Sequence, residues 1–312
     1  MALPVPGSEL TTPDPVEVIA TRRGRPRLFK AILRNRKASV GTLILLLIIF
    51  VAAFPGLVAP DSPSASLYSP DTNPSWSHLL GTTQIGQDVF SQLIWSTRQT
   101  LLVTLLVSVI ATFTSTIVGI TAAYVGGLTD RVLTIITDVF LILPVLPLLI
   151  LLAAYLAPGV SSLVLVLCIT SWAFQARQLR SQGLSLRNRD FLESARVRGE
   201  RGIYIILVEI VPTMTSLLAA SFFSLAVYVV GFAASLQFLG LGNSGQLMWG
   251  TMLYNAEQAG GLSSGGNVWW LLGPGAAVAV LGVSFALLNY AFDEIGNPAL
   301  RPVRRRRARA SA

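Results

Sequence analysis

Few side chains in this sequence are of types that carry out chemistry. The chain has one histidine, His78, and one cysteine, Cys168, which exclude multi-histidine and multi-cysteine metal sites and a disulfide framework. It contains no phosphate-binding loop, no H-E-x-x-H helix and no credible Ser/His/Asp set. Two acids, Asp138 and Glu209, lie in or beside apolar segments, where an acid either couples ions to transport or forms a structural ion pair. We therefore expect no catalytic residue, no metal and no cofactor on this chain itself.

The most informative polar segment is Asp190-Phe-Leu-Glu-Ser-Ala-Arg-Val-Arg-Gly199, which lies between two long apolar runs. Asp190 suits an N-cap, and Glu193 follows three residues later, as in a capping box. Arg196 suits the last turn, and Gly199 suits the left-handed position that follows many helices. The pattern predicts a self-contained helix over 190–199 on which a soluble partner docks; an ordinary helical loop is the alternative.

The composition indicates what kind of structure flanks and positions this segment. With 53% apolar and 12% charged residues and a mean hydropathy of +0.64, the chain lies outside the range of soluble domains. Runs long enough to cross a bilayer of about 30 Å occur at 39–59, 99–124, 132–156, 160–176, 203–239 and 268–292. Pro144 and Pro147 predict a kink in the third run, and Pro212 and Gly231 predict a kinked or partly interfacial fifth run. We expect an all-α membrane protein of about six transmembrane helices.

Basic residues gather on one side of these spans. Of 23 Lys and Arg residues, eight precede the first span, one is Arg131, seven lie between Arg177 and Arg201, and six follow the last span, which leaves only Arg98 on the other side. Basic loops are retained in the cytoplasm, so both termini and the 190–199 helix are predicted to be cytoplasmic. Topology and lipid contact account for the net charge of +8, and no nucleic-acid partner is expected.

The chain divides into four parts on this interpretation. Residues 1–37 form a basic, partly disordered cytoplasmic tail, and 38–98 form the first transmembrane helix and an external segment. Residues 99–292 form the core with the 190–199 helix, and 293–312 form a second basic cytoplasmic tail. The long polar stretch before the first apolar run argues against a cleavable signal peptide.

Four motifs occur along the chain in a defined order. They are Leu80-Gly-Thr-Thr-Gln-Ile-Gly-Gln-Asp88, Ala123-Tyr-Val-Gly-Gly127 with Asp138-Val-Phe-Leu-Ile-Leu-Pro144, Glu193-Ser-Ala-Arg-Val-Arg-Gly199 with Pro212, and Ala234-Ser-Leu-Gln-Phe-Leu-Gly-Leu-Gly242 with Trp249-Gly-Thr-Met-Leu253. Together they resemble the inner-membrane permease subunits of ABC importers of the dipeptide/oligopeptide/nickel type, over about residues 30–302. The resemblance implies a type I ABC importer permease fold in a bacterial inner (plasma) membrane, crossed several times.

The resemblance also implies roles and partners. The 190–199 segment would be the coupling helix that contacts the ATPase, through Asp190, Glu193, Ala195, Arg196 and Gly199. ATP and Mg would bind two cytoplasmic ATPase subunits, and a second permease, expected to be a different chain, would complete the translocation path. An external solute-binding protein would dock on 60–97 and 240–267. The motif residues assigned to external docking or gating are Gly81, Thr82, Gly86, Asp88, Gly240, Gly242 and Trp249. The glycines and Asp88 of the first motif also predict a tight turn that starts the helix of the second span.

Three positions are candidates for the translocation path, namely Ala233, Gln237 and Asp138. Family members often have glutamate where this chain has Ala233 and serine where it has Gln237, so the cargo could differ from that of typical dipeptide systems. For Asp138 we favour a structural role, pairing with Arg131 or capping a helix. Four tryptophans at predicted external span ends are expected to form an interfacial belt: Trp95, Trp249, Trp269 and Trp270.

The predicted function is that of an ATP-driven importer permease, with di- or oligopeptides as the leading cargo. An oligosaccharide or nickel-type importer is the alternative, because neutral residues replace charged ones at several motif positions. An ion-coupled secondary transporter would use Asp138 or Glu209 and show an internal repeat, and no convincing repeat is found. A receptor or scaffold protein could also bind a soluble partner through a cytoplasmic helix. Such a protein would not require the external motifs found in this sequence.

Overall fold

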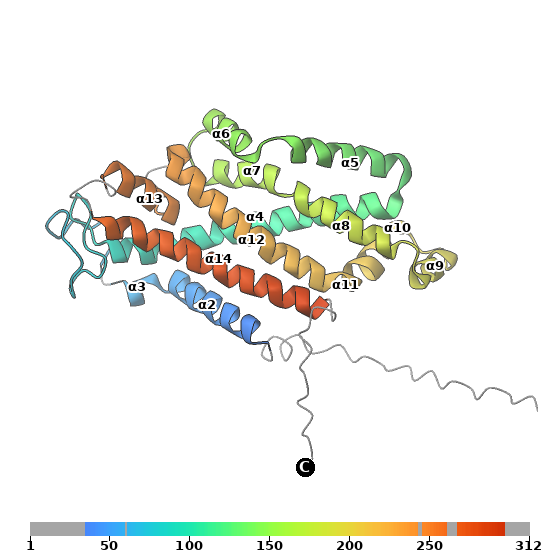
Figure 1. The fold of residues 1–312 in the computed structure, drawn as a ribbon, viewed down its shortest axis with the longest axis horizontal. Coiled ribbons are helices and arrows are strands. Elements are labelled where there is room, and N and C mark those ends of the chain that lie inside the picture. The colour runs from blue at the N-terminus through green and yellow to red at the C-terminus, as the bar shows by residue number, and fades with distance from the viewer. Residues whose placement is uncertain (1–34, 60, 243–244, 261–266, 297–312) are drawn as a thin grey trace, which may run out of the picture.

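The computed structural model describes residues 35–59, 61–242, 245–260 and 267–296, and in this part the chain is helical without a β-strand. The helices are α2 (Arg36–Ala53), α3 (Pro55–Val58), α4 (Val89–Val125), α5 (Gly127–Ile142), α6 (Val145–Tyr155), α7 (Val160–Ser171), α8 (Ala173–Leu186), α9 (Asp190–Val197), α10 (Gly202–Tyr204), α11 (Val211–Thr213), α12 (Thr215–Leu236), α13 (Trp249–Gln258) and α14 (Val268–Gly296) (Figure 1). Two π-helical segments occupy Ile205–Ile210 and Gln237–Leu241. Of the tails predicted over 1–37 and 293–312, residues 1–34 and 297–312 lie outside the described residues.

The number of candidate membrane spans agrees with the sequence. Five stretches are long and apolar enough to cross a bilayer: Arg36–Ala53, Val89–Val125, Val160–Leu186, Thr215–Leu241 and Val268–Glu294. The pair α5 and α6 makes a sixth when counted as one span broken by an 89° bend. The bend lies at Leu143 and Pro144, because proline lacks a backbone N–H and keeps the preceding residue extended (φ −66°, ψ 131°). An all-α membrane protein with a kinked third span is confirmed.

Three span boundaries differ from the sequence prediction. Helix α4 begins at Val89 rather than near residue 99, so it continues through the boundary expected at 98 and 99. The fourth span continues as α8 to Leu186, ten residues beyond its predicted end at 176, and Arg177 and Arg180 in this extension pair with acids of α5. The fifth run breaks at Met214, beside Pro212, whereas Gly231 lies inside the continuous helix α12.

Close helix packing builds the core around the long helix α4. At Gly119 a Cβ would lie 2.5 Å from the carbonyl oxygen of Ala176, so glycine is required for α4 and α8 to approach this closely. Gly41 allows α2 to approach α14 in the same way, and the Ser284 hydroxyl donates a 2.9 Å hydrogen bond to the Gly41 carbonyl. Small residues and hydroxyl hydrogen bonds at such contacts are typical of helices packed in membranes.

The two ends of the helix bundle differ in structure. At one end, Asn35 donates a 2.8 Å hydrogen bond to Glu294, so the start of α2 and the end of α14 lie side by side. Helix α9 projects from this same end, and residues 61–88 and α13 form the opposite end (Figure 1). Trp249, the first residue of α13, and Trp270 of α14 are buried in one apolar cluster rather than facing a membrane interface, so the predicted aromatic belt is wrong for these two. Trp95 and Trp269 are exposed.

Candidate functional sites

Helix α9 is held on the bundle by its apolar side. Leu192 and Ala195 are fully buried in a cluster that includes Leu179 of α8 and Ile205 and Ile210 of the π-helical segment. Their spacing of three residues places both on one face of the helix. Val197, by contrast, is 84% exposed. The helix therefore sits on the bundle in a fixed orientation and presents its other face outward.

The start of α9 differs from the sequence prediction. Arg189, not Asp190, is the N-cap: its backbone is extended (φ −84°, ψ 142°), and its carbonyl accepts the N–H groups of Leu192 and Glu193. No side chain caps the helix, so the predicted capping box is absent. Asp190 and Glu193 instead lie in the first turn, where their negative charges interact favourably with the helix dipole.

The end of α9 agrees with the sequence prediction. Gly199 has φ +78°, and its N–H donates to the carbonyl of Arg196 at 2.9 Å. The N–H of Glu200 donates to the carbonyl of Ala195 at 3.2 Å, which completes a Schellman motif. An added Cβ at Gly199 would meet no atom within 4 Å, so glycine is needed here for its backbone conformation alone.

Charged side chains connect α9 to its surroundings. The Arg196 guanidinium lies over the Tyr124 ring of α4, 5.4 Å from its centroid. The Nη2 atom of Arg198 lies 3.6 Å from Oε1 of Glu209, an acid whose role the sequence left open. A hollow of about 550 Å³ beside the helix is lined by Arg187, Asn188, Glu193, Arg196 and Val197. This end thus presents a polar helix next to an open, mainly basic recess.

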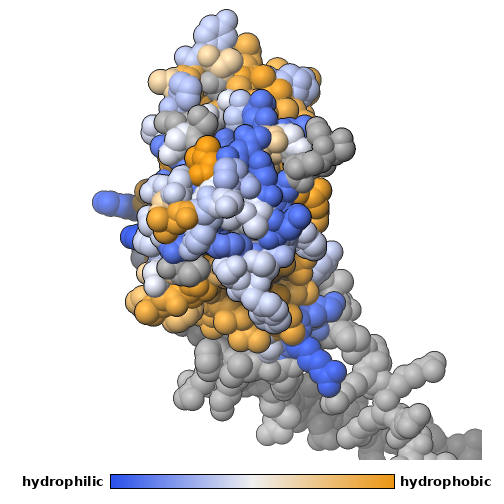
Figure 2. All heavy atoms as spheres, turned by 90° about the vertical axis from the view of Figure 1, so that its left-hand side faces the viewer, coloured by the Kyte–Doolittle hydropathy of each residue, from blue (hydrophilic) through white to orange (hydrophobic). Residues whose placement is uncertain are grey.

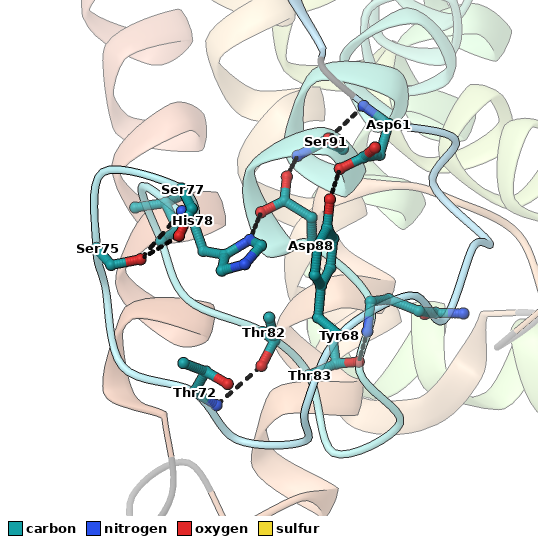
Figure 3. A network of polar contacts seen from close by, with 12 residues as sticks. Asp61, Tyr68, Thr72, Ser75, Ser77, His78, Thr82, Thr83, Asp88 and Ser91 are labelled. Carbon is teal, nitrogen blue, oxygen red and sulfur yellow. Dashed lines mark hydrogen bonds and ion pairs between the residues drawn. The ribbon is translucent and has the colours of Figure 1, made fainter.

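At the opposite end, the motif residues build the start of α4. The Asp88 carboxylate accepts a 2.7 Å hydrogen bond from the Ser91 N–H and caps the helix, as predicted. Its other oxygen lies 3.6 Å from Nδ1 of His78, and both atoms are buried. The Tyr68 ring packs against His78, and the Tyr68 hydroxyl donates to Asp61 at 2.8 Å (Figure 3). This hydrogen bond is the main cause of a raised pKa of Tyr68, and partial burial and the nearby carboxylates raise the pKa further.

Two glycines and a threonine of the first motif fold this segment tightly. Gly81 (φ +75°) lies against the carbonyl of Thr72, where a Cβ would approach to 2.3 Å. Gly86 (φ +73°) lies as closely against the carbonyl of Tyr68. Thr82 is fully buried, and its hydroxyl accepts the N–H of Thr72 and donates to the carbonyl of Ser69 (Figure 3). The motif therefore determines the shape of this end.

A neutral hollow of about 580 Å³ lies between this segment and α13. Carboxamide side chains line much of it: Gln84, Gln87, Gln92, Gln246, Asn255 and Gln258. No charged side chain is among the described residues of its lining. Figure 2, which views this end of the molecule, shows a mainly hydrophilic face with apolar surface along its sides. Such a face fits the exit from a bilayer, with polar groups available to a partner.

Several residues of the fourth motif are buried inside the helix bundle. Ala233 and Gln237 are 3% and 2% exposed, and the Gln237 side chain packs against Gly250 of α13. Trp249 donates its indole N–H to the Leu93 carbonyl at 3.2 Å. Gly240 has φ +79° and interrupts the helix, which lets the chain turn towards α13. Gly242 follows in an extended conformation.

Asp138 forms a structural ion pair, as favoured, but with another partner. It pairs with Arg177 of α8 rather than with Arg131. Arg131 is seven residues away on the same helix, a rise of about 10.5 Å, which is too long for a direct contact. A second pair joins Asp130 to Arg180 at 2.5 Å. The sequence pattern did not identify Arg177 and Arg180 as partners, because the acids that they pair with come from a helix about 40 to 50 residues away along the chain.

The bent span, the projecting polar helix and the tightly folded motif over residues 80–88 are consistent with a helical membrane permease. Residues 115–301 match the family of binding-protein-dependent transport system inner membrane components, and the chain belongs to this family. It is a permease subunit of an ABC importer and a multi-pass protein of the bacterial inner membrane.

Curated relatives and a solved structure agree with this assignment. The chain is 30% identical to the dipeptide transport system permease protein DppC of Bacillus subtilis, over 86% of this chain and 83% of the relative. It is 29% identical to the oligopeptide transport system permease protein OppC of Mycobacterium bovis, over 90% of this chain and 97% of the relative. A chain of the MetNI methionine ABC transporter in an inward-facing conformation superposes with a TM-score of 0.53 at 17% identity, over 67% of this chain and 97% of that one. The last likeness supports the fold.

Proposed function

We propose that this chain forms, with a second and different permease, the translocation path of an ATP-driven peptide importer, and that α9 is its coupling helix. The observation that carries this proposal is the construction of α9: an apolar face buried in the bundle, a Schellman motif at Gly199, and a polar outer face beside a basic recess. A helix fixed in this way transmits a push from a docked protein to the bundle. Its docking surface comprises Asp190, Glu193 and Arg196, with Ala195 and Gly199 fixing its position.

The energy source and orientation follow from the same proposal. Two ATPase subunits bind ATP and Mg and dock from the cytoplasm, so the end with α9, the start of α2 and the end of α14 is cytoplasmic. The distribution of basic residues supports this orientation, because 22 of 23 lie on the predicted cytoplasmic side. The four-part division at 1–37, 38–98, 99–292 and 293–312 remains our proposed organisation, with α4 spanning the second and third parts.

The opposite end receives the solute-binding protein. The neutral hollow between residues 61–92 and α13 gives that end a concave surface rich in carboxamides, suited to neutral polar groups of a partner. Gly81, Thr82, Gly86 and Asp88 act by shaping this surface, since Thr82 and Asp88 are buried and both glycines abut backbone.

The path residues act in the same indirect way. Ala233 and Gln237 are buried and support the position of α13. Gly240 and Gly242 form the turn that leads to α13, and Trp249 anchors its first residue in the core. A change in the position of α13 would therefore gate the path. Asp138 contributes through its ion pair with Arg177.

Peptides are the proposed cargo because the curated relatives are named as dipeptide and oligopeptide permeases. Uptake into proteoliposomes of a labelled tripeptide, compared with a labelled trisaccharide, tests the cargo. Accumulation of the tripeptide is expected, and accumulation of the trisaccharide alone would reassign the cargo.

Affinity purification of the tagged chain from its native membrane tests the coupling helix. We expect two ATPase chains and a second permease to co-purify with the native chain. Gly199→Asp should reduce the ATPases and keep the permease, whereas Gly282→Ala, in open space on α14, should keep both. Intact chain without any ATPase would refute the proposal.

A further inference from the structure

A polar seam joins α5 to α8. On α5, Asp130, Thr134, Thr137 and Asp138 follow the spacing i, i+4, i+7, i+8 and so share one face of the helix. Thr137 is the buried residue of α5, and many of its apolar residues are exposed, such as Leu128 at 77% and Ile142 at 80%, whereas Phe140 and Leu141 pack in a small apolar cluster around Trp172. Over residues 130–138, helix α5 therefore meets this chain mainly through polar groups.

Two ion pairs make the seam's strongest contacts. The Nε and terminal nitrogens of Arg180 contact the two carboxylate oxygens of Asp130 at 2.5 and 2.8 Å. Arg177 pairs with Asp138 further along α5. The bidentate geometry of the Asp130–Arg180 pair fixes orientation as well as distance. The seam thus specifies how α5 is aligned on α8.

Apolar packing across the seam is sparse between the pairs. A hollow of about 240 Å³ lies among α4, α5 and α8, and Asp138, Arg177 and Arg180 line it. At the end of α5, Phe140 packs on Trp172, with ring centroids 5.3 Å apart. On the other side, α8 is pressed directly against α4 at Gly119. Helix α8 is therefore packed closely against α4, while α5 is attached to α8 by the two ion pairs and, at its end, by the apolar contact of Phe140 and Leu141.

Helix α8 also leads directly into α9. Three residues separate the end of α8 at Leu186 from Asp190, and the Leu186 carbonyl accepts the Arg189 N–H at 2.9 Å. The Arg187 guanidinium lies against Gly126 at the corner between α4 and α5, where a Cβ would approach Nη1 to 2.7 Å. A displacement of α9 would therefore move α8 and this corner directly, because no flexible linker separates them.

We propose that Asp130–Arg180 and Asp138–Arg177 are the link that makes α5 move with α8 as one unit when α9 is displaced. This inference rests on the proposed coupling role of α9. The four residues are positioning residues: they carry the movement of the coupling helix to α5 and to the 89° bend that follows it.

Spin labels at Ile142 on α5 and Leu184 on α8, both exposed, test this proposal in a Cys168→Ala background, with the complete transporter in nanodiscs. In the native seam, the distance distribution between the labels should be the same without nucleotide and after trapping with ATP and vanadate. In the Asp130→Asn/Asp138→Asn variant it should shift or broaden on trapping. Stimulation of ATP hydrolysis by the solute-binding protein should fall by about two- to 30-fold.

Two further variants make the result decisive. The charge-swapped variant Asp130→Arg/Arg180→Asp, which keeps the Asp138 pair, should retain most of the native behaviour. Arg131→Gln removes a charge from the adjacent exposed position and should change neither readout. A nucleotide-dependent distance in the native seam, or native behaviour in the double asparagine variant, would overturn the proposal. Absence of ATPases from the native preparation would instead overturn the proposed function on which it rests.

Discussion

The Arg196 guanidinium of α9 lies over the face of Tyr124, 5.4 Å from the ring centroid, near the end of α4. Tyr124 also lies against Gly202, where a Cβ would come within 3.2 Å of its ring. One aromatic ring thus contacts both α9 and the chain that leaves it. The contact connects α9 with the longest helix of the bundle.

The ring of Tyr124, rather than its hydroxyl, should be responsible for this connection. Tyr124→Phe keeps the cation–π contact and should retain native ATPase co-purification. Tyr124→Ala removes a contact worth about 0.5–1 kcal/mol and should weaken ATPase binding by roughly two- to fivefold. Quantitative titration of the purified ATPase against each variant measures the effect. Equal loss in both variants would mean that the hydroxyl matters instead.

The backbone conformation at Gly199 should matter more than the space around it. Gly199→Ala places a Cβ in open space at φ +78° and should destabilise the end of α9 by about 1–2 kcal/mol. Gly282→Ala adds the same methyl group in open space within the helix α14 and should be neutral or stabilising. Hydrogen exchange at the amides of residues 196–200 compares the two. Unchanged protection in Gly199→Ala would contradict the role given to the Schellman motif.

Gly119 should tolerate no side chain. Gly119→Ala places a Cβ 2.5 Å from the Ala176 carbonyl oxygen and should cost about 1–3 kcal/mol by overpacking. The thermal midpoint in detergent should fall, while Gly231→Ala, with nothing within 4 Å, should leave it unchanged or raise it. An unchanged midpoint for Gly119→Ala would show that α4 and α8 can separate freely.

The cap at Asp88 should hold residues 61–88 in place. Asp88→Ala removes the acceptor for the Ser91 N–H and should cost about 1 kcal/mol, whereas Asp88→Asn keeps an acceptor and should cost less. Limited proteolysis within residues 61–88 should therefore be faster in the alanine variant. Equal cleavage rates in all three chains would argue against the cap as the anchor.

The phenol of Tyr68 should titrate above its usual range, because it donates to Asp61 and nearby carboxylates oppose its ionisation. A raised pKa in the folded state means that the neutral form is favoured. The stabilisation is complete below the ordinary pKa of tyrosine and is lost as the pH rises through the raised value. Asp61→Asn should lower this pKa, as read from ultraviolet difference titration against Tyr68→Phe. The same titration curve with and without Asp61 would contradict the assignment.

The sequence predicted those features that depend on local chemistry. Gly199 and Asp88 were predicted correctly because a left-handed glycine and an N-cap depend on a few neighbouring residues. The bend at Pro144 follows from the covalent geometry of proline. The number of membrane spans followed from the number of apolar runs long enough to cross a bilayer.

Features that depend on the packing of distant segments were missed. The Asp138–Arg177 pair joins residues 39 positions apart, and no spacing rule identifies such a partner. Trp249 was placed in an aromatic belt because its neighbours lie near a predicted span end, but α13 folds back and buries it. The N-cap was misplaced by one residue because Arg189 is extended and offers only its carbonyl, without a capping side chain such as Ser, Thr, Asp or Asn to mark it.

Photocrosslinking from α9 tests the central claim, that this helix receives the ATPase. Benzoylphenylalanine in place of Val197, which is 84% exposed, should form an adduct with an ATPase subunit in native membranes. The same group at Ile85, 63% exposed at the opposite end, should not form this adduct. ATPase adducts at Val197 alone are the predicted result. A correctly inserted chain that forms no ATPase adduct at Val197, or forms it equally at Ile85, would contradict the account.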